Sequence, residues 1–456
     1  MNLEIIILAA GQGTRMKSPL PKVLHQIAGQ PMLQHVISVA RDLNPSAIHV
    51  VVGHGAEEVK EAMAAETLQW VVQEQQLGTG HAVLQAMPRV DERSTVLVLY
   101  GDVPLIRLDT LQGLVEKGTK APALLTAQVT DPAGYGRILR GDDDSVLGVV
   151  EHKDANQEQL LINEINTGVL AAPAADLKRY LPAVGNANSQ GEYYLPDVLA
   201  MAVADDKTVA AQLATSELEV LGVNDRLQLN QVERECQLRQ AQQLLRDGVS
   251  VADAARLDIR GSLHCGVDVS IDINVVIEGQ VVLGDGVSIG PNCVLKNVTI
   301  ADGASVHAMS HLEDARVGAK ANVGPYARLR PGTVLAEGAR VGNFVETKKA
   351  NIGAGSKVNH LSYIGDCDMG AGVNVGAGTI TCNYDGVNKH KTSLGDDVFV
   401  GSNSTLVAPL AVADGGFIGA GSTVTKAVGE KELAVSRAKQ RNILGWQRPS
   451  KDSGEA

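Results

Sequence analysis

Between residues 283 and 424 an apolar residue returns at a nearly fixed step of six, and this repeat constrains the fold more than any other feature. The clearest run is Val317, Val323, Leu329, Leu335 and Val341. A helix repeats at about 3.6 residues and an alternating strand at about 2, so neither explains the step. A period of six is typical of hexapeptide-repeat β-helices, in which each unit forms one short face of a coil. One unit cannot bury its apolar residue alone, so we expect stacked coils that share a narrow core.

The composition agrees with a slender β-helix joined to other structure. The chain has 456 residues, 44% of them apolar, which is enough for two or three domains with cores of their own. Aromatic residues make up only 3%, whereas 48 residues are glycine, as expected where wide rings do not fit the interior. The net charge of −12 argues against nucleic acid or an anionic membrane as the main partner, although a local cationic pocket remains possible.

The sequence carries no sign of export or membrane insertion. No apolar run approaches the length of a membrane span, and residues 1–4 lead straight into a strand rather than a signal peptide. The five cysteines are odd in number, scattered and free of CxxC spacing, which favours reduced thiols. We therefore expect a cytoplasmic protein with no membrane partner.

A glycine-rich loop follows the first apolar run. Residues 5–8 are typical of a buried parallel strand, and residues 9–16 read AAGQGTRM. Backbone amides of such a loop can approach phosphate oxygens closely. No GK[ST] follows, so the loop is not a Walker A motif, and Met16 replaces the third glycine of a dinucleotide fingerprint. Small residues and two cations, Arg15 and Lys22, remain; they suit a triphosphate, although the GxG alone is equally compatible with a tight structural turn.

Further strands and one long helix complete the amino-terminal half. Residues 50–52 and 70–72 read as strands separated by helix-like stretches, which predicts a doubly wound parallel sheet with its ligand at the carboxyl ends of the strands. Residues 96–101 form a similar run that ends at Asp102, a hard oxygen ligand for a divalent cation, although one Asp is weak support. Residues 225–246 repeat at helical spacing with Asp225 as a plausible amino cap, which predicts a helical arm between two domains.

These motifs resemble a known family. The stretch LAAGQGTRM with Pro21-Lys22 resembles the opening of the sugar-1-phosphate nucleotidyltransferases. Joined to a hexapeptide repeat, it is similar to the bacterial bifunctional enzymes that combine N-acetylglucosamine-1-phosphate uridyltransferase and glucosamine-1-phosphate N-acetyltransferase activities, over nearly the whole chain. The fold class that this implies is α/β plus all-β: a Rossmann-like nucleotidyltransferase domain (1–226), a helical linker arm (227–250) and a left-handed parallel β-helix of hexapeptide repeats with a carboxy-terminal tail (251–456).

The resemblance also implies the residues of the uridyltransferase site. Those expected to bind UTP are Leu8, Ala9, Ala10, Gly11, Arg15, Lys22, Gln73, Gly78, Thr79, Tyr100, Gly101 and Asp102. Those expected to bind the sugar phosphate are Gly136, Glu151, Asn166 and Asn224. Asp102 and Asn224 are the implied ligands of Mg²⁺, which takes few protein oxygens because it keeps waters and phosphates.

In the repeat, function is expected where the period is interrupted. Residues 381–386 read TCNYDG, and residues 387–392 leave the period, which predicts a polar loop extruded from a rigid scaffold. Acetyl transfer to an amino sugar needs a base that removes a proton near neutral pH, and histidine suits that task. The resemblance implies His360 as this base. The implied sugar-phosphate residues are Arg330, Lys348, Tyr363 and Asn374, and the implied acetyl-CoA residues are Ala377, Asn383, Tyr384, Ser402, Ala420 and Arg437.

The expected enzyme acetylates glucosamine 1-phosphate with acetyl-CoA and then transfers UMP from UTP to the product, with Mg²⁺ as cofactor, as a homotrimer that feeds bacterial cell-envelope synthesis. Two other interpretations remain. The repeat could be a scaffold for a nucleotidyltransferase with one activity, which leaves the set around His360 unexplained. A non-enzymatic assembly role would leave the glycine-rich loop and Asp102 unexplained.

Overall fold

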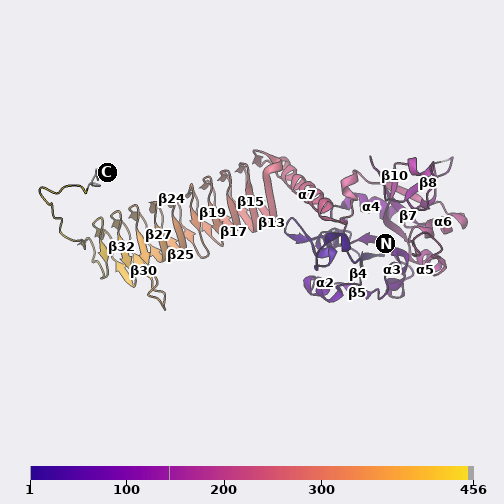
Figure 1. Cartoon of the computed structure of the whole chain (residues 1–456), viewed down its shortest axis with the longest axis horizontal. Helices are drawn as coiled ribbons and strands as arrows, with labels where there is room; N and C mark the ends of the chain where they lie inside the picture. The colour runs from indigo at the N-terminus through magenta and orange to yellow at the C-terminus, as the bar shows by residue number, and fades with distance from the viewer. Residues whose placement is uncertain (1, 143, 450–456) are drawn as a thin grey trace, which may run out of the picture. The chain divides into compact units, whose positions relative to one another are not determined.

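The structure, a computed structural model, describes residues 2–142 and 144–449. The chain forms two compact units that divide between Gln240 and Ala241, inside helix α7 (Arg226–Arg246). Each unit has hydrophobic clusters of its own. Figure 1 shows the sheet-and-helix unit that carries the amino terminus and the stack of coils that follows it in the chain.

The first unit is built on a nine-stranded sheet. Its strand order is β11 (Ala210–Leu213), β7 (Ala123–Gln128), β10 (Glu164–Pro173), β6 (Thr95–Tyr100), β1 (Leu3–Ala9), β4 (Ala47–Val52) and β5 (Gln69–Val72), with β8 (Arg137–Arg140) and β9 (Val146–Val150) attached beside β10. Strand β1 runs parallel to β4 and β6, whereas β10 runs antiparallel to β6 and β7. A short hairpin, β2 (Gln26–Ile27) and β3 (Gln30–Pro31), lies outside the sheet.

Helices cover both faces of this sheet, because its central strands are apolar on both sides. In β1, Ile5 and Ile7 belong to one buried cluster, and Ile6 and Leu8 belong to another. The first cluster takes in α1 (Met32–Asp42), α2 (Ala56–Ala62) and α4 (Leu108–Lys117), and the second takes in α3 (Thr79–Ala86), α5 (Ala174–Tyr180) and α6 (Asp197–Ala204). The predicted doubly wound fold is confirmed, with the antiparallel strand β10 between β6 and β7 and a β8–β9 hairpin at its side.

The second unit is a parallel β-helix whose strands form two long ladders, one of which bends around a corner. The first ladder is β12 (Ser250–Val251), β14 (Ser270–Ile271), β16 (Ser288–Ile289), β18 (Ser305–Val306), β21 (Asn322–Val323), β24 (Arg340–Asn343), β26 (Lys357–His360), β28 (Asn374–Val375), β31 (Phe399–Val400), β34 (Phe417–Ile418) and β36 (Leu433–Ala434). The second contains β13 (Leu257–Cys265), β15 (Val275–Leu283), β17 (Val294–Ile300), β19 (His311–Glu313), β20 (Arg316–Val317), β22 (Arg328–Leu329), β23 (Val334–Leu335), β25 (Glu346–Ile352), β27 (Tyr363–Met369), β29 (Ile380–Cys382), β30 (Thr392–Leu394), β32 (Thr405–Val407), β33 (Leu410–Val412) and β35 (Thr423–Val424).

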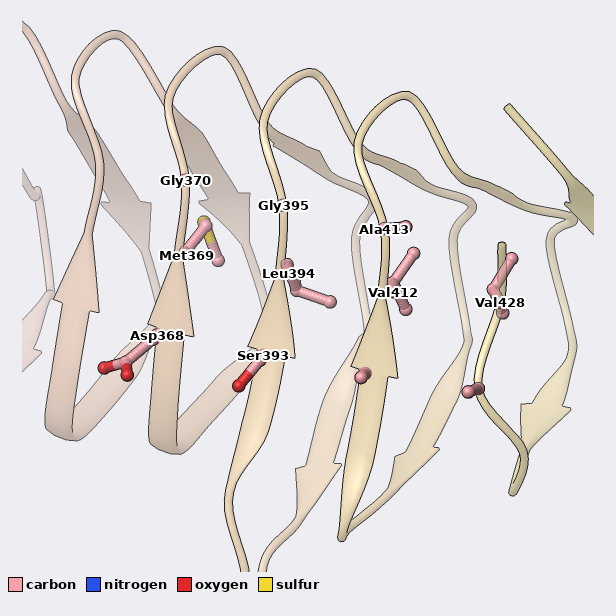
Figure 2. Close-up of a pocket in the computed structure, with 11 residues that line it drawn as sticks. Asp368, Met369, Gly370, Ser393, Leu394, Gly395, Val412, Ala413 and Val428 are labelled. Atoms are coloured by element: carbon pink, nitrogen blue, oxygen red, sulfur yellow. The ribbon is translucent and has the colours of Figure 1, made fainter. Parts of the chain in front are cut away.

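The six-residue period is the inward position of this coil. Val317, Val323, Leu329, Leu335 and Val341 are all at most 2% exposed and belong to one continuous cluster. Figure 2 shows the pattern in the last coils, where Met369, Leu394, Val412 and Val428 project to one side of their strands, and Asp368 and Ser393 project to the other. The β-helix predicted from the repeat is therefore confirmed, and its parallel coils agree with the expected left-handed class.

Two further features bear on the sequence expectations. Among the residues that the structure describes, no helix is both long and apolar enough to cross a membrane. All five cysteines carry free thiols, and Cys293 and Cys367 are buried.

Candidate functional site

The glycine-rich loop meets the end of strand β6 because β1 and β6 are parallel neighbours. Leu8 pairs with Tyr100, and the Gly101 amide donates to the Leu8 carbonyl at 2.9 Å. Gly13 adopts φ +62°, and a Cβ there would lie 2.7 Å from Cβ of Lys22. Glycine at this position therefore lets Lys22 approach the loop.

A cavity of about 310 Å³ opens at this junction. It is lined by Leu8, Ala9, Ala10, Gly11, Lys22, Val23, Gln73, Gln76, Gly78, Thr79, Ala82, Tyr100, Asp102 and Glu192. All the predicted UTP residues except Arg15 and Gly101 are among them. The loop, the β5 end and the β6 end thus form one concave site at the carboxyl edge of the sheet, where ligands of such folds bind.

One end of this cavity gathers two oxygens and two cations. Lys22 Nζ forms an ion pair with Asp102 and lies 3.3 Å from Asn224 Oδ1. Arg15 donates to the same Asn224 oxygen at 2.9 Å. Asn224 is turned this way because its Nδ2 donates to the Gly222 carbonyl. Asp102 and Asn224 therefore present hard oxygens to a common cation, here the Lys22 ammonium, and this donor set fits Mg²⁺.

At the other end the polar groups are held by their neighbours. Gln73 is 3% exposed, and its Nε2 donates to His81 Nδ1 at 2.9 Å and to the Gly78 carbonyl at 3.3 Å. The Thr79 hydroxyl accepts from the Leu195 amide at 3.1 Å. Burial, with the negative charge of Asp102, raises the pKa of Tyr100, so its phenol stays protonated. This end therefore offers fixed amide and hydroxyl groups, with the Glu192 carboxylate also in the lining.

The predicted sugar-phosphate residues Gly136, Glu151 and Asn166 lie together, and the charge of Glu151 acts on Tyr100, which lines this cavity. The Asn166 amide donates to the Gly136 carbonyl at 2.9 Å. A Cβ on Gly136 would lie 3.0 Å from Glu151 Oε1, so glycine leaves space for that carboxyl. Burial raises the pKa of Glu151, and the charges of Asp154, Asp197 and Glu192 raise it further.

The second candidate site lies on the surface of the β-helix. His360, at the end of β26, has an exposed ring, and Tyr363 begins the next face of the same coil. His360 Nδ1 lies 2.8 Å from Oδ1 of Asn343, which is its partner on the preceding coil. Because an amide oxygen only accepts, Nδ1 donates the hydrogen in this pair, and in the neutral imidazole Nε2 is then the nitrogen with a free lone pair. That is the protonation state that a general base needs.

Cations gather on the face that Tyr363 shares with the preceding coils. Arg330 Nη1 forms an ion pair with Glu346 at 2.8 Å, and Glu346 pairs in register with Tyr363. The neighbouring ammonium of Lys389 lowers the pKa of Lys348, and partial burial and the charge of Arg330 lower it further. Two ammonium groups this close make a site for an anion such as a phosphate.

The predicted acetyl-CoA residues follow His360 from coil to coil. The Gly378 amide donates to the His360 carbonyl at 3.3 Å, and the Asn403 amide donates to the Ala377 carbonyl at 2.7 Å. The Gly421 amide then donates to the Ser402 carbonyl at 2.8 Å, and Arg437 donates to the Ala420 carbonyl at 2.7 Å. Ala377, Ser402, Ala420 and Arg437 thus mark one corner of the β-helix, starting beside the His360 backbone.

Asn383 and Tyr384 lie on the loop that interrupts the repeat, whereas Asn374 lies on a strand of the first ladder. Asn383 donates to Asp366, and the His390 amide donates to the Asn383 carbonyl at 2.8 Å. Tyr384 is exposed, and its backbone forms an isolated antiparallel β-bridge with Lys389 across the loop. Asn374 begins β28 and pairs with Lys357 of the coil that carries His360.

Three residues around these sites were not predicted: Asn343, Glu346 and Lys389. Asn343 and Glu346 stand 17 residues before His360 and Tyr363, one coil earlier, so the repeat length itself could have placed them. Lys389 lies in the stretch that leaves the period, where no spacing indicates its neighbours.

A larger hollow, of about 620 Å³, lies along the last coils (Figure 2). Small and apolar residues line most of it. Its one ionisable side chain, Asp368, is already paired with Lys391. Among the residues that line this hollow, none is therefore an unpaired ionisable side chain.

Comparison with known proteins agrees with two functional halves. The MobA-like NTP transferase domain family matches residues 5–158, and the GMPPB C-terminal domain family matches residues 259–349. The bifunctional protein GlmU of Marinobacter nauticus is 56% identical over 450 residues, covering 98% of this chain and 99% of that protein. Those of Pseudomonas putida strain GB-1 and Stutzerimonas stutzeri are 57% and 56% identical over 452 residues, covering 99% of this chain and 99% and 100% of theirs. The chain belongs to the family of bifunctional GlmU proteins.

Proposed function

We propose that this chain makes UDP-N-acetylglucosamine in two reactions on two sites. Glucosamine 1-phosphate is first acetylated by acetyl-CoA on the β-helix, and the product then receives UMP from UTP in the first unit, with release of pyrophosphate. Two features found together in one member of this family carry this proposal. One is the cavity at the glycine-rich loop, with Lys22 and Asp102 in its lining, and the other is an exposed, oriented His360. A scaffold would need neither the His360–Asn343 pair nor the nearby cations.

In the acetyl transfer, the sugar amine attacks the thioester carbonyl directly. The new C–N bond forms as the C–S bond breaks, His360 Nε2 takes the proton from the nitrogen, and the thiolate of CoA receives it. Arg330, Lys348 and Lys389 hold the phosphate. Tyr363 and Asn374 bind the sugar, and Asn383, Tyr384 and the corner strip from Ala377 to Arg437 bind the acyl donor. A general base of this kind is worth roughly 10²–10⁴ in rate.

In the uridylyl transfer, a phosphate oxygen of N-acetylglucosamine 1-phosphate attacks the α-phosphorus of UTP in line with the departing pyrophosphate. Arg15 and Lys22 neutralise the triphosphate, and the backbone of residues 8–11 positions it. Asp102 and Asn224 would hold Mg²⁺, which when bound neutralises phosphate charge. Gln73, Gly78 and Thr79 bind the base, and Gly136, Glu151 and Asn166 bind the sugar.

Three wider properties belong to the same proposal. Residues 1–226 carry the uridylyl transfer and residues 251–456 carry the acetyl transfer, with a helical arm (227–250) between them. The enzyme works in the cytoplasm. It assembles as a homotrimer; the exposed, stacked rings of Tyr326 and Phe344, 5.2 Å apart on adjacent coils, support a contact between chains along that corner. Light scattering in solution should give three times the 47.8 kDa of one chain, and a monomer mass would refute this assembly.

Substrate assays with and without a chelator test the proposal. We expect thiol release from acetyl-CoA with glucosamine 1-phosphate, and pyrophosphate release from UTP with N-acetylglucosamine 1-phosphate. EDTA should abolish pyrophosphate release and leave thiol release unchanged, because only the uridylyl step uses Asp102 and Asn224 with a metal. Absence of either activity would refute the bifunctional assignment, and equal loss of both with EDTA would refute the metal site.

A further inference from the structure

Arg137 is an unusual residue in the first unit because its guanidinium is buried without an acidic partner. Its side chain is 1% exposed and is among the largest fully buried side chains. Among residues 2–142 and 144–449, no carboxylate forms an ion pair with it. Arg140, on the same strand, instead makes a two-pronged ion pair with Glu164 at 2.8 and 2.7 Å. An unpaired buried charge is costly, so a compensating role is expected at this position.

The Arg137 side chain joins two segments of the predicted sugar site. Its Nη1 donates to the Tyr135 carbonyl, and its Nη2 lies 3.5 Å from Nδ1 of His152, which can only accept from a guanidinium. Tyr135 immediately precedes Gly136, and His152 immediately follows Glu151. The Nε hydrogen has no partner, so the two ends of the fork make the only hydrogen bonds seen at this guanidinium among the described residues.

The third sugar-site segment meets the same strand. Arg137 pairs with Val150 on one side and with Ile165 on the other, and Ile165 precedes Asn166. Gly136, Glu151 and Asn166 therefore all lie one residue from a backbone or side-chain partner of Arg137. Because a Cβ on Gly136 would come within 3.0 Å of Glu151 Oε1, small movements of either segment change the space between them.

We propose that Arg137 is a positioning residue for the sugar phosphate, which sets the separation of the Gly136 and Glu151 segments without touching the substrate. The planar fork of arginine can hold a carbonyl and an imidazole at fixed spacing, whereas a lysine ammonium at the end of a flexible chain cannot. This inference rests on the proposed uridyltransferase function and deepens it, because it makes the binding of the sugar phosphate depend on a buried residue outside the binding surface.

The test is Arg137→Met, which keeps an unbranched, flexible apolar stem and removes the charge and the donors of the guanidinium. We expect KM for N-acetylglucosamine 1-phosphate to rise roughly 10- to 100-fold, since small misplacements of binding groups cost that much. KM for UTP should stay within about twofold. Thermal stability should change little, because removal of an unpaired buried charge offsets the loss of its hydrogen bond to the Tyr135 carbonyl. Acetyl transfer on the same chain reports that the rest of the protein is intact.

His152→Phe is the second variant, which removes one contact of the fork while filling its space, and it should give the same selective rise in KM. Arg140→Met is the matched control and should leave both KM values unchanged. An unchanged KM for the sugar phosphate, or an equal rise in both KM values, would overturn the inference. If Arg137→Met fails to fold, the His152→Phe result decides alone. A wild-type protein without uridylyl transfer would instead overturn the proposed function.

Discussion

The chemistry of His360 depends on a single neighbouring side chain. Asn343 accepts from Nδ1, which leaves Nε2 as the ring nitrogen that would take the proton in the proposed acetyl transfer. The same logic orients histidine in catalytic triads, where a carboxylate replaces the amide. An amide carries no net charge, so it fixes the tautomer but does not stabilise the imidazolium cation as a carboxylate would.

Asn343→Ala should lower kcat for acetyl transfer roughly 10- to 100-fold, less than the loss of the base itself, because the imidazole remains but is no longer held in one tautomer. Initial rates of thiol release at saturating substrates measure this. The control is Asn322→Ala, which breaks a similar contact, His307 Nε2 to Asn322 Oδ1 at 2.7 Å, elsewhere on the β-helix. Equal rates for Asn343→Ala and the wild type would show that the pair has no catalytic role.

A buried carboxylate predicts how the stability of the first unit depends on pH. Burial alone would raise the pKa of Glu4, but hydrogen bonds from His49, the Ser94 hydroxyl and the Asp91 amide outweigh it and lower that pKa below 4.5. Since the folded pKa is lowered, the ionised form stabilises the fold above pH 4.5, and this contribution is lost as the pH falls toward the folded value.

Glu4→Gln should therefore flatten the acid limb of the unfolding free energy, measured by denaturant titration from neutral pH downward. Glu57→Gln, at a side chain that is 87% exposed, should retain the slope of the wild type. A Glu4→Gln profile that runs parallel to the wild type below pH 4.5 would contradict the assigned shift.

At the scale of elements, the coil was predictable because one rule fixes it. Each inward residue recurs after six positions, so the sequence alone predicts the core of the β-helix, and the apolar run at residues 5–8 predicts the central strand of the sheet. The direction of a strand could not be predicted in the same way. Strand β10 is antiparallel to β6, but its pattern of apolar residues would be the same for a parallel strand. Asn343 lies one coil of 17 residues before His360, so adding up the steps of a whole coil would have found it, whereas Lys389 lies in a loop outside the period, where no spacing indicates its neighbours.

The six-residue period also predicts which substitutions destabilise the β-helix, because neighbouring inward and outward residues can be compared. Leu335 is 2% exposed in the continuous core, whereas its neighbour Val334 points outward and is 39% exposed. Leu335→Ala should destabilise the β-helix by roughly 2–5 kcal/mol, because it leaves a cavity between coils that cannot collapse. Val334→Ala should cost far less in the same chemical denaturation experiment. Similar costs for the two variants would show that the period does not define the core.

At the scale of the molecule, two compact units each carry a core and a site. The division at Gln240 falls inside α7, whose first turns pack against the first unit through Val232 in a cluster with Met16 and Met32. The proposed boundary near residue 227 lies at the start of this helix instead. A substitution in one unit should therefore remove the activity proposed for that unit and leave the activity proposed for the other.

The most direct test is a comparison of His360→Ala with Asp102→Asn, each assayed for both half-reactions and then mixed. His360→Ala should lose acetyl transfer by roughly 10²–10⁴-fold and keep uridylyl transfer, and Asp102→Asn should do the reverse. A mixture of the two, supplied with glucosamine 1-phosphate, acetyl-CoA and UTP, should form UDP-N-acetylglucosamine although neither variant does so alone. If either substitution removes both activities, or if the mixture stays inactive, two separable sites on one chain cannot be the basis of this enzyme.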